Sequence, residues 1–129
     1  AGERALDPLA KLLRAKSAED LEQKTIGHND HVIIIGYGIS GQLLTSSLRS
    51  LSIETVVLEM NSDNVSIGRE RGDPVYYADA TSEEALGHAH LESSRAVVVM
   101  INDHSATERV LATIERLKVN VPIFVRKGF

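Results

Sequence analysis

Five short runs of mostly apolar residues are the feature that most constrains the fold of this chain. Each run is four to six residues long and does not alternate with polar residues, which is typical of strands covered on both faces of a parallel sheet. The runs span residues 31–36, 55–60, 75–78, 96–101 and 122–125. Because parallel neighbours need a long crossover between them, we expect helices in the intervening segments. The pattern predicts an α/β domain whose five-stranded parallel sheet is doubly wound.

Two of the connections carry apolar stripes at helical spacing, so each predicted helix can lie on the sheet. The stripes consist of Ile39, Leu43, Leu44, Ser47, Leu48 and Leu51, and of Ala106, Val110, Ile114 and Leu117. Thr81 and Glu84 form a capping-box pattern, which predicts another helix with Thr81 at its N-cap. Asp103 or Ser105 is expected to cap the helix after the fourth run.

The N-terminal segment differs from the rest. Residues 1–27 predict a helix or two with Leu6, Leu9 and Leu13 near one face, and the turn at 27–30 ends them. We therefore divide the chain into a helical linker, 1–29, and an α/β domain, 30–129. The linker's balanced charges and modest apolar face favour docking on a neighbouring protein over insertion into lipid. A plain solvated tether is the alternative.

Composition excludes several functions. The chain of 129 residues has no cysteine, which removes disulfides, thiolate metal sites and cysteine nucleophiles. The net charge is -4 and the sequence contains no basic stripe, so we expect no nucleic-acid partner. No apolar run approaches the ~20 residues of a membrane helix. The histidines lack partners at ligand spacing, so we expect no metal site and place all five at surface or capping positions. No catalytic set is recognisable.

A GxGxxG motif follows the first apolar run directly. Its residues are Gly36, Tyr37, Gly38, Ile39, Ser40 and Gly41. In a strand–loop–helix setting, the first glycine permits a tight turn, the second lets the backbone approach a phosphate, and the third lets helix and strand pack closely. The amides and dipole of the following helix favour an anion. The motif therefore predicts a Rossmann-like nucleotide site.

Glu59 is the acidic partner that such a site needs. It lies 18 residues beyond Gly41, at the end of the second run, where a carboxylate accepts hydrogen bonds from both ribose hydroxyls. A 2'-phosphate there would meet like-charge repulsion. We therefore expect NAD(H), AMP, ADP or ATP as ligand and disfavour NADP. The alternative is a glycine turn that binds nothing, with Glu59 as a solvated strand end.

Beyond these motifs, the sequence resembles the TrkA-N, or RCK, regulatory domain, and within it the cytoplasmic domain of Kef-type (CPA2) monovalent cation:proton antiporters. Five blocks carry the resemblance, in the family's order and spacing: 31–38, 41–42, 57–61, 72–81 and 122–126. The resemblance covers about residues 30–129. A complete domain of this family would continue into a sixth strand, so we expect a truncated domain here and a longer parent protein.

The resemblance implies a nucleotide-sensing domain, usually a homodimer, on the cytoplasmic face of the cell membrane. Its other partner would be the membrane transport domain of the parent protein, joined through the linker. The implied binding residues are the loop 36–41 for the phosphates, Glu59 with Met60 and Asn61 for the ribose, Asp79 and Ala80 for the adenine edge, and Asn102 and Asp103 for the phosphate or nicotinamide side.

Two positions depart from the family pattern. Many members carry Arg where this chain has Ile39, and Gly where it has Ala78. Loss of the arginine removes a cation near the phosphates, which favours NAD(H) or AMP over ATP. An NAD-dependent oxidoreductase, of which this chain would be the nucleotide half, is the alternative function. A third possibility is an interaction module whose site is empty.

Overall fold

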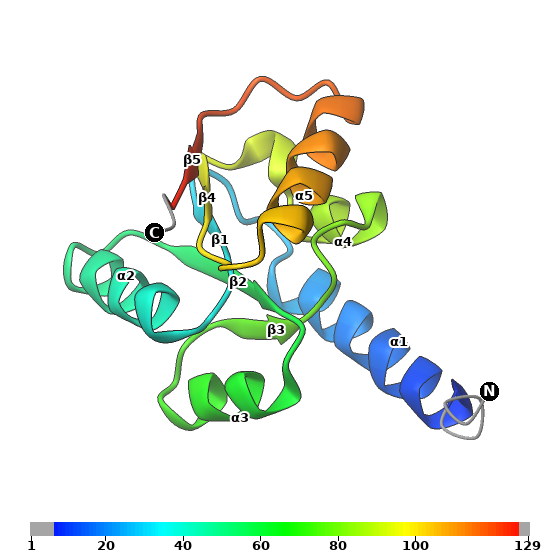
Figure 1. The fold of residues 1–129 in the computed structure, drawn as a ribbon. Coiled ribbons are helices and arrows are strands. Elements are labelled where there is room, and N and C mark those ends of the chain that lie inside the picture. The colour runs from blue at the N-terminus through cyan, green and yellow to red at the C-terminus, as the bar shows by residue number, and fades with distance from the viewer. Residues whose placement is uncertain (1–6, 127–129) are drawn as a thin grey trace.

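The computed structural model describes residues 7–126 as one five-stranded parallel sheet with helices on both faces (Figure 1). The strands are β1 (Val32–Ile35), β2 (Thr55–Glu59), β3 (Val75–Tyr77), β4 (Ala96–Val99) and β5 (Ile123–Val125). Their order is β3-β2-β1-β4-β5. The chain therefore leaves β1 in one direction and later returns to its other side, which is the Rossmann-like, doubly wound arrangement that the apolar runs predict.

The helices form two layers against this sheet. They are α1 (Asp7–Lys24), α2 (Ile39–Ser50), α3 (Ser62–Glu70), α4 (Glu83–His88) and α5 (His104–Arg116), with a short 3-10 turn at Leu91–Ser93. Alternate residues of β1 point into separate cores: Val32 and Ile34 face α2 and α3, whereas Ile33 and Ile35 face the layer of α1, α4 and α5. Both faces of the central strands are thus covered.

The helix caps correct one expectation. Ser82, not Thr81, is the N-cap of α4, and its Oγ accepts a hydrogen bond from the Ala85 N–H at 3.2 Å. Thr81 lies one residue outside the cap, in a turn where the carboxylate of Asp79 accepts hydrogen bonds from its amide and its hydroxyl, at 2.9 and 2.7 Å. The cap at Asp103 is confirmed, since its Oδ1 accepts from the Ala106 N–H at 3.2 Å.

The N-terminal segment forms a single helix in the described part of the chain. The N-terminal half of α1 extends away from the sheet (Figure 1), and Leu9 and Leu13 are 58% and 55% exposed; Leu6 lies outside the described residues. Leu21, by contrast, is fully buried in the core against β3 and α4. The helix is therefore half attached to the domain. No helix among the described residues is long and apolar enough to cross a membrane.

Two further expectations are wrong. The fifth strand was expected to be covered on both faces, but Ile123, Phe124 and Val125 are all exposed, because β5 lies at the edge of the sheet. The histidines were expected at surface or capping positions, but His31 is fully buried at the start of β1. His31 is buried because the segment that connects α1 to β1 packs against the end of α4.

Candidate functional site

The glycine loop joins β1 to α2 at the carboxyl edge of the sheet. Gly36 has φ +109, and a Cβ on it would lie 3.0–3.2 Å from atoms of Met100 and Ile101 after β4. A Cβ on Gly41 would lie 2.0 Å from the carbonyl oxygen of Gly36. Both positions therefore require glycine, as the motif predicts. Gly38 is the N-cap of α2 and is open, with nothing within 4 Å of a Cβ.

Glu59 fixes this loop. One carboxylate oxygen accepts a hydrogen bond from the Tyr37 N–H at 2.6 Å, and the other accepts from the Asn61 N–H at 2.8 Å. The end of β2 thereby holds both the glycine loop and the turn into α3. Each carboxylate oxygen accepts more than one hydrogen bond, so Glu59 keeps acceptor capacity for a ligand hydroxyl.

A pocket of about 430 Å³ opens at this edge of the sheet. Eight of the expected binding residues line it: Gly36, Gly38, Glu59, Met60, Asp79, Ala80, Asn102 and Asp103. They come from the ends of β1, β2, β3 and β4, which is where open α/β sheets bind ligands. The structure thus brings together residues that are up to 67 positions apart, from Gly36 to Asp103.

Five expected residues do not line the pocket, namely Tyr37, Ile39, Ser40, Gly41 and Asn61. The Tyr37 side chain is fully buried in the opposite core, where its hydroxyl donates to Asp73, a carboxylate that also pairs with Arg49. Ile39 is 79% exposed. Asn61 caps α3, because its side chain accepts from the Asp63 and Asn64 amides at 2.9 and 3.1 Å.

The polar groups at the far side of the pocket are also held by the protein. The Asp79 carboxylate accepts a hydrogen bond from the Thr81 amide, and the Asp103 carboxylate caps α5. Asn102 Oδ1 accepts a hydrogen bond from Arg126, just after β5. The site is therefore preorganised, since each of its carboxylates is oriented by a hydrogen bond from a backbone amide.

Sequence reasoning missed the apolar wall of the pocket and its cation. Leu58, Met100, Ile101, Ala106 and Val110 contribute apolar lining. Arg109 is the single basic residue among the lining residues, and its guanidinium contacts Ser105 Oγ at 2.7 Å. The signal was present, because Arg109 is three residues from Ala106 and so shares its side of α5.

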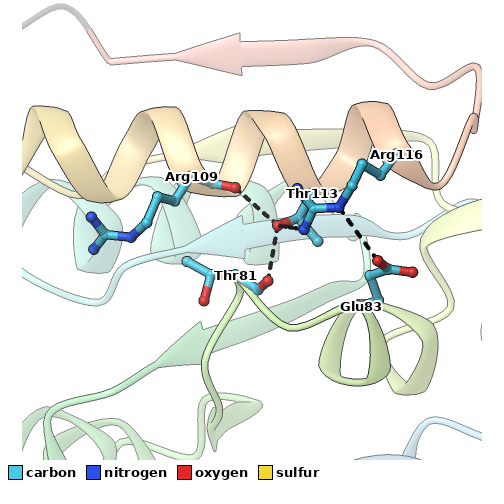
Figure 2. A network of polar contacts seen from close by, with 5 residues as sticks. All are labelled: Thr81, Glu83, Arg109, Thr113 and Arg116. Atoms are coloured by element: carbon cyan, nitrogen blue, oxygen red, sulfur yellow. Dashed lines mark hydrogen bonds and ion pairs between the residues drawn. The ribbon is translucent and has the colours of Figure 1, made fainter.

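The β3–α4 loop is tied to α5 by a separate network (Figure 2). Thr113 Oγ1 lies 2.8 Å from the Thr81 carbonyl and 3.0 Å from Arg116 Nη2, and Arg116 reaches Glu83 at 3.4 Å. The Arg109 guanidinium points away from this network, toward the N-terminal end of α5 (Figure 2). Arg109 and Arg116 therefore lie on one helix with different surroundings.

The helix α1 borders the same site. A second pocket of about 240 Å³ lies between α1 and α4, and Arg14, Ala18 and Leu21 of α1 contribute to it. Met60, Ala78 and Asp79 line both pockets. These three residues of the candidate site therefore also face α1. Among the described residues, no group of three metal-ligating side chains comes together.

Comparisons with known proteins agree with this geometry. The TrkA-N domain family model matches residues 32–127. The K(+) efflux antiporter 1, chloroplastic, of Arabidopsis thaliana is 34% identical over 111 residues, 86% of this chain and 9% of that protein. The glutathione-regulated potassium-efflux system protein of Haemophilus influenzae is 30% identical over 97 residues, 75% of this chain and 16% of that protein. The chain thus spans a small part of the curated relatives it matches.

Solved structures show the same fold. The TrkA-N domain of inner membrane protein ybaL from Escherichia coli has a TM-score of 0.71 and 29% identity, covering 80% of this chain and 76% of that chain. The GsuK channel bound to NAD has a TM-score of 0.70 at 22% identity, covering 77% and 18%. GsuK bound to ADP gives 0.68 at 20%, covering 77% and 26%. With its sheet order, its glycine loop and these matches, the chain belongs to the TrkA-N domain family.

Proposed function

We propose that this chain is the nucleotide-binding regulatory domain of a potassium or cation:proton antiporter, and that it binds NAD(H) or AMP. The observation that carries the proposal is the pocket at the carboxyl edge of the sheet, where Glu59 fixes the glycine loop beside the N-terminus of α2. The names of the relatives support the transport role, and the GsuK structures with NAD and ADP support the ligand class.

In this proposal the ligand's phosphate lies at the glycine loop, because the first amides of α2 are free to donate to it. Glu59 accepts hydrogen bonds from the ribose, and Asp79 and Ala80 border the adenine. Asn102 and Asp103 face the nicotinamide side when NAD(H) is bound. Arg109, which lines the same pocket as Glu59, Asp79 and Asp103, would supply the positive charge that Ile39 does not.

Ligand binding would regulate transport by shifting a population of arrangements. Two copies of the domain would form a dimer at the cytoplasmic face of the membrane, with α1 leading to the transport domain. Because α1 faces Met60, Ala78 and Asp79 through the second pocket, it is placed to respond to the occupied site. The domain itself would be a sensor and not an enzyme.

Isothermal titration calorimetry with NADH, AMP, ADP, ATP and NADPH tests the ligand. We expect NADH and AMP to bind, and NADPH to bind about tenfold more weakly or worse, because its 2'-phosphate approaches the Glu59 carboxylate. Glu59→Gln is the matched variant, which removes the like charge and should narrow the gap between NADH and NADPH. If no adenine nucleotide binds, the proposed function fails.

A turnover assay separates the sensor from the oxidoreductase alternative. The chain with bound NADH is expected to leave the nicotinamide unoxidised over hours when small carbonyl compounds are added. Hydride transfer by the chain alone would contradict the regulatory role.

A further inference from the structure

His31 is a titratable group that the nucleotide site does not use. Its side chain is fully buried at the start of β1, and Nε2 lies 2.7 Å from the carbonyl oxygen of Ala89. A carbonyl oxygen only accepts, so Nε2 carries the proton and donates it. Nδ1 is buried and has no hydrogen-bond partner among the described residues. The imidazole is therefore held in its neutral form.

Four of the five histidines gather around this point. His28 and His31 precede β1, and their rings meet edge to face at 5.7 Å. His88 and His90 lie at the end of α4 and in the turn after it. Like His31, each of these two has a buried ring nitrogen without a partner in the described part of the chain. Titratable side chains are thus concentrated at one place, outside the lining of the larger pocket, and one of them, His88, lines the smaller pocket between α1 and α4.

That place is where two segments of the chain are fastened together. Residues 25–31, which lead from α1 into β1, pack on residues 88–95, which lead from α4 into β4; we call this contact the histidine joint. Besides the His31–Ala89 hydrogen bond and the side-chain pair of Asp30 with Arg95, four hydrogen bonds cross it: Thr25 Oγ1 to His88 O at 3.0 Å, Asp30 N to Ser93 O at 2.8 Å, Ser93 Oγ to His28 O at 3.1 Å and Arg95 N to His31 O at 2.7 Å. The joint lies at the amino ends of β1 and β4, opposite the nucleotide pocket.

The charged groups around the joint determine how protons act on it. Burial lowers the pKa of His31, and the neighbouring His28 and His90 lower it further, whereas the Ala89 carbonyl and Glu54 oppose the shift. Asp30 Oδ2 forms an ion pair with Arg95 Nη2 at 2.7 Å, and Glu54 Oε2 lies 3.6 Å from His28 Nε2. The His88–Glu22 pair, at 3.0 Å, strengthens when His88 is charged and so acts in the opposite direction.

We propose that His31 makes the histidine joint a proton-sensitive latch, which holds α1 to the sheet when His31 is neutral and releases it when His31 is protonated. A proton on buried Nδ1 has no acceptor and adds charge beside two other histidines, so the closed joint binds the proton less well than the open one. Closure is therefore complete above the ordinary histidine pKa of about 6.5 and weakens as the pH falls below it. This inference is independent of the nucleotide function.

Hydrogen exchange followed by NMR tests the latch on the whole chain. After correction for the intrinsic rate, the opening constant of the Asp30 and Arg95 amides should rise by up to about tenfold per pH unit between about pH 6.5 and about pH 5.5. The amides of Gly36 and Met100, at the other end of the sheet, serve as the internal reference and should change less. A parallel rise at both ends would show global unfolding and would overturn the latch.

Two variants isolate the residue. His31→Gln keeps an amide donor for the Ala89 carbonyl but cannot be protonated, so the pH dependence of the joint should disappear. His104→Gln is the matched control, because His104 is exposed on α5 outside the joint, and it should behave as the parent chain does. If the opening of the joint in His31→Gln still depends on pH as it does in the parent chain, the proposal is wrong.

A direct titration of the imidazole covers the case in which His31→Gln does not fold. Correlation spectra of the ring nitrogens in the unaltered chain should show His31 as the Nε2–H tautomer, still neutral below about pH 6.5. Finding the proton on Nδ1, or a transition at or above the ordinary value, would refute the latch.

Discussion

At the scale of single residues, the glycine loop shows how one hydrogen atom in place of a methyl group decides a contact. A Cβ on Gly41 would overlap the Gly36 carbonyl, and one on Gly36 would be crowded by the chain after β4 at a strained positive φ, whereas Gly38 has open space around it. The same three glycines therefore serve two purposes. Two of them let strand, loop and helix meet, and the third leaves the approach to the α2 N-terminus open.

Gly41→Ala is expected to destabilise the domain by about 1–3 kcal/mol, because the new Cβ meets the Gly36 carbonyl in a packed backbone contact. Gly38→Ala is the matched control and should leave the free energy of unfolding within about 0.5 kcal/mol of the parent. Chemical denaturation measures both. In the proposed function Gly38→Ala should nevertheless weaken nucleotide binding, and equal stability losses in the two variants would contradict this assignment.

Arg109 gives a second residue-scale test. Arg109→Gln should weaken binding of AMP and ADP by about tenfold or more, because a charge-assisted hydrogen bond to phosphate is lost. Arg116→Gln is the control, since Arg116 lies on the same helix but pairs with Glu83 outside the pocket. Calorimetry with adenosine is decisive: it has no phosphate, so its affinity should not change in either variant. An equal loss for adenosine would assign Arg109 to the base instead.

At the scale of elements, α1 belongs partly to the domain and partly to its surroundings. Its C-terminal end contributes Leu21 to the buried interior, and Thr25 just after it is also buried, while Leu9, Leu12 and Leu13 are all more than half exposed. The C-terminal half of α1 thus packs on the domain, and its N-terminal half is exposed. A rigid helix of this kind can transmit a change at the sheet to whatever the N-terminal half contacts.

Leu21→Ala should lower the free energy of unfolding by about 2–4 kcal/mol, since it leaves a cavity in the core. Leu13→Ala should change it by less than about 0.5 kcal/mol, because that side chain is exposed. Thermal and denaturant unfolding of the two variants give the comparison. Equal effects would show that α1 does not pack on the sheet.

At the scale of the whole molecule, the two ends of the parallel sheet carry different chemistry. The carboxyl ends hold the candidate pocket, and the amino ends hold the histidine joint. Arg14 and Ala18 of α1 line the smaller pocket beside the first, and Thr25, just after α1, donates a hydrogen bond to the His88 carbonyl in the second. The helix α1 and the turn that follows it therefore lie beside both ends of the sheet.

The exposed face of α1 gives a prediction at this scale. If it docks on a second copy of the chain, replacing Leu9 and Leu13 together by Asp should shift the chain toward the monomer in analytical ultracentrifugation. Lys11→Asp is the control, because it changes charge on the same helix without removing apolar surface. A mass unaffected by the leucine changes would leave α1 as a plain tether.

Sequence and structure contributed differently to what is known of this chain. The sequence predicted the five strands and the helix α2. It also predicted that positions 36 and 41 require glycine. Each of these features depends on residues that are close together in sequence. The cap of α4 was misplaced by one residue because Thr81 belongs to the turn that Asp79 closes, and where that turn ends depends on the local path of the backbone. The exposure of β5 followed from its place at the sheet edge, which apolarity alone does not encode.

The sequence by itself determined the fold class, the loop and the acidic residue beside it, since periodicity and steric demands act locally. Only the tertiary structure decided that Tyr37 turns its side chain away from the pocket, that Arg109 faces into it, and that His31 lies buried among other histidines. The physical reason is that burial and charge balance depend on which distant segments meet. That meeting is set by the packing of the whole chain and not by any one stretch of it.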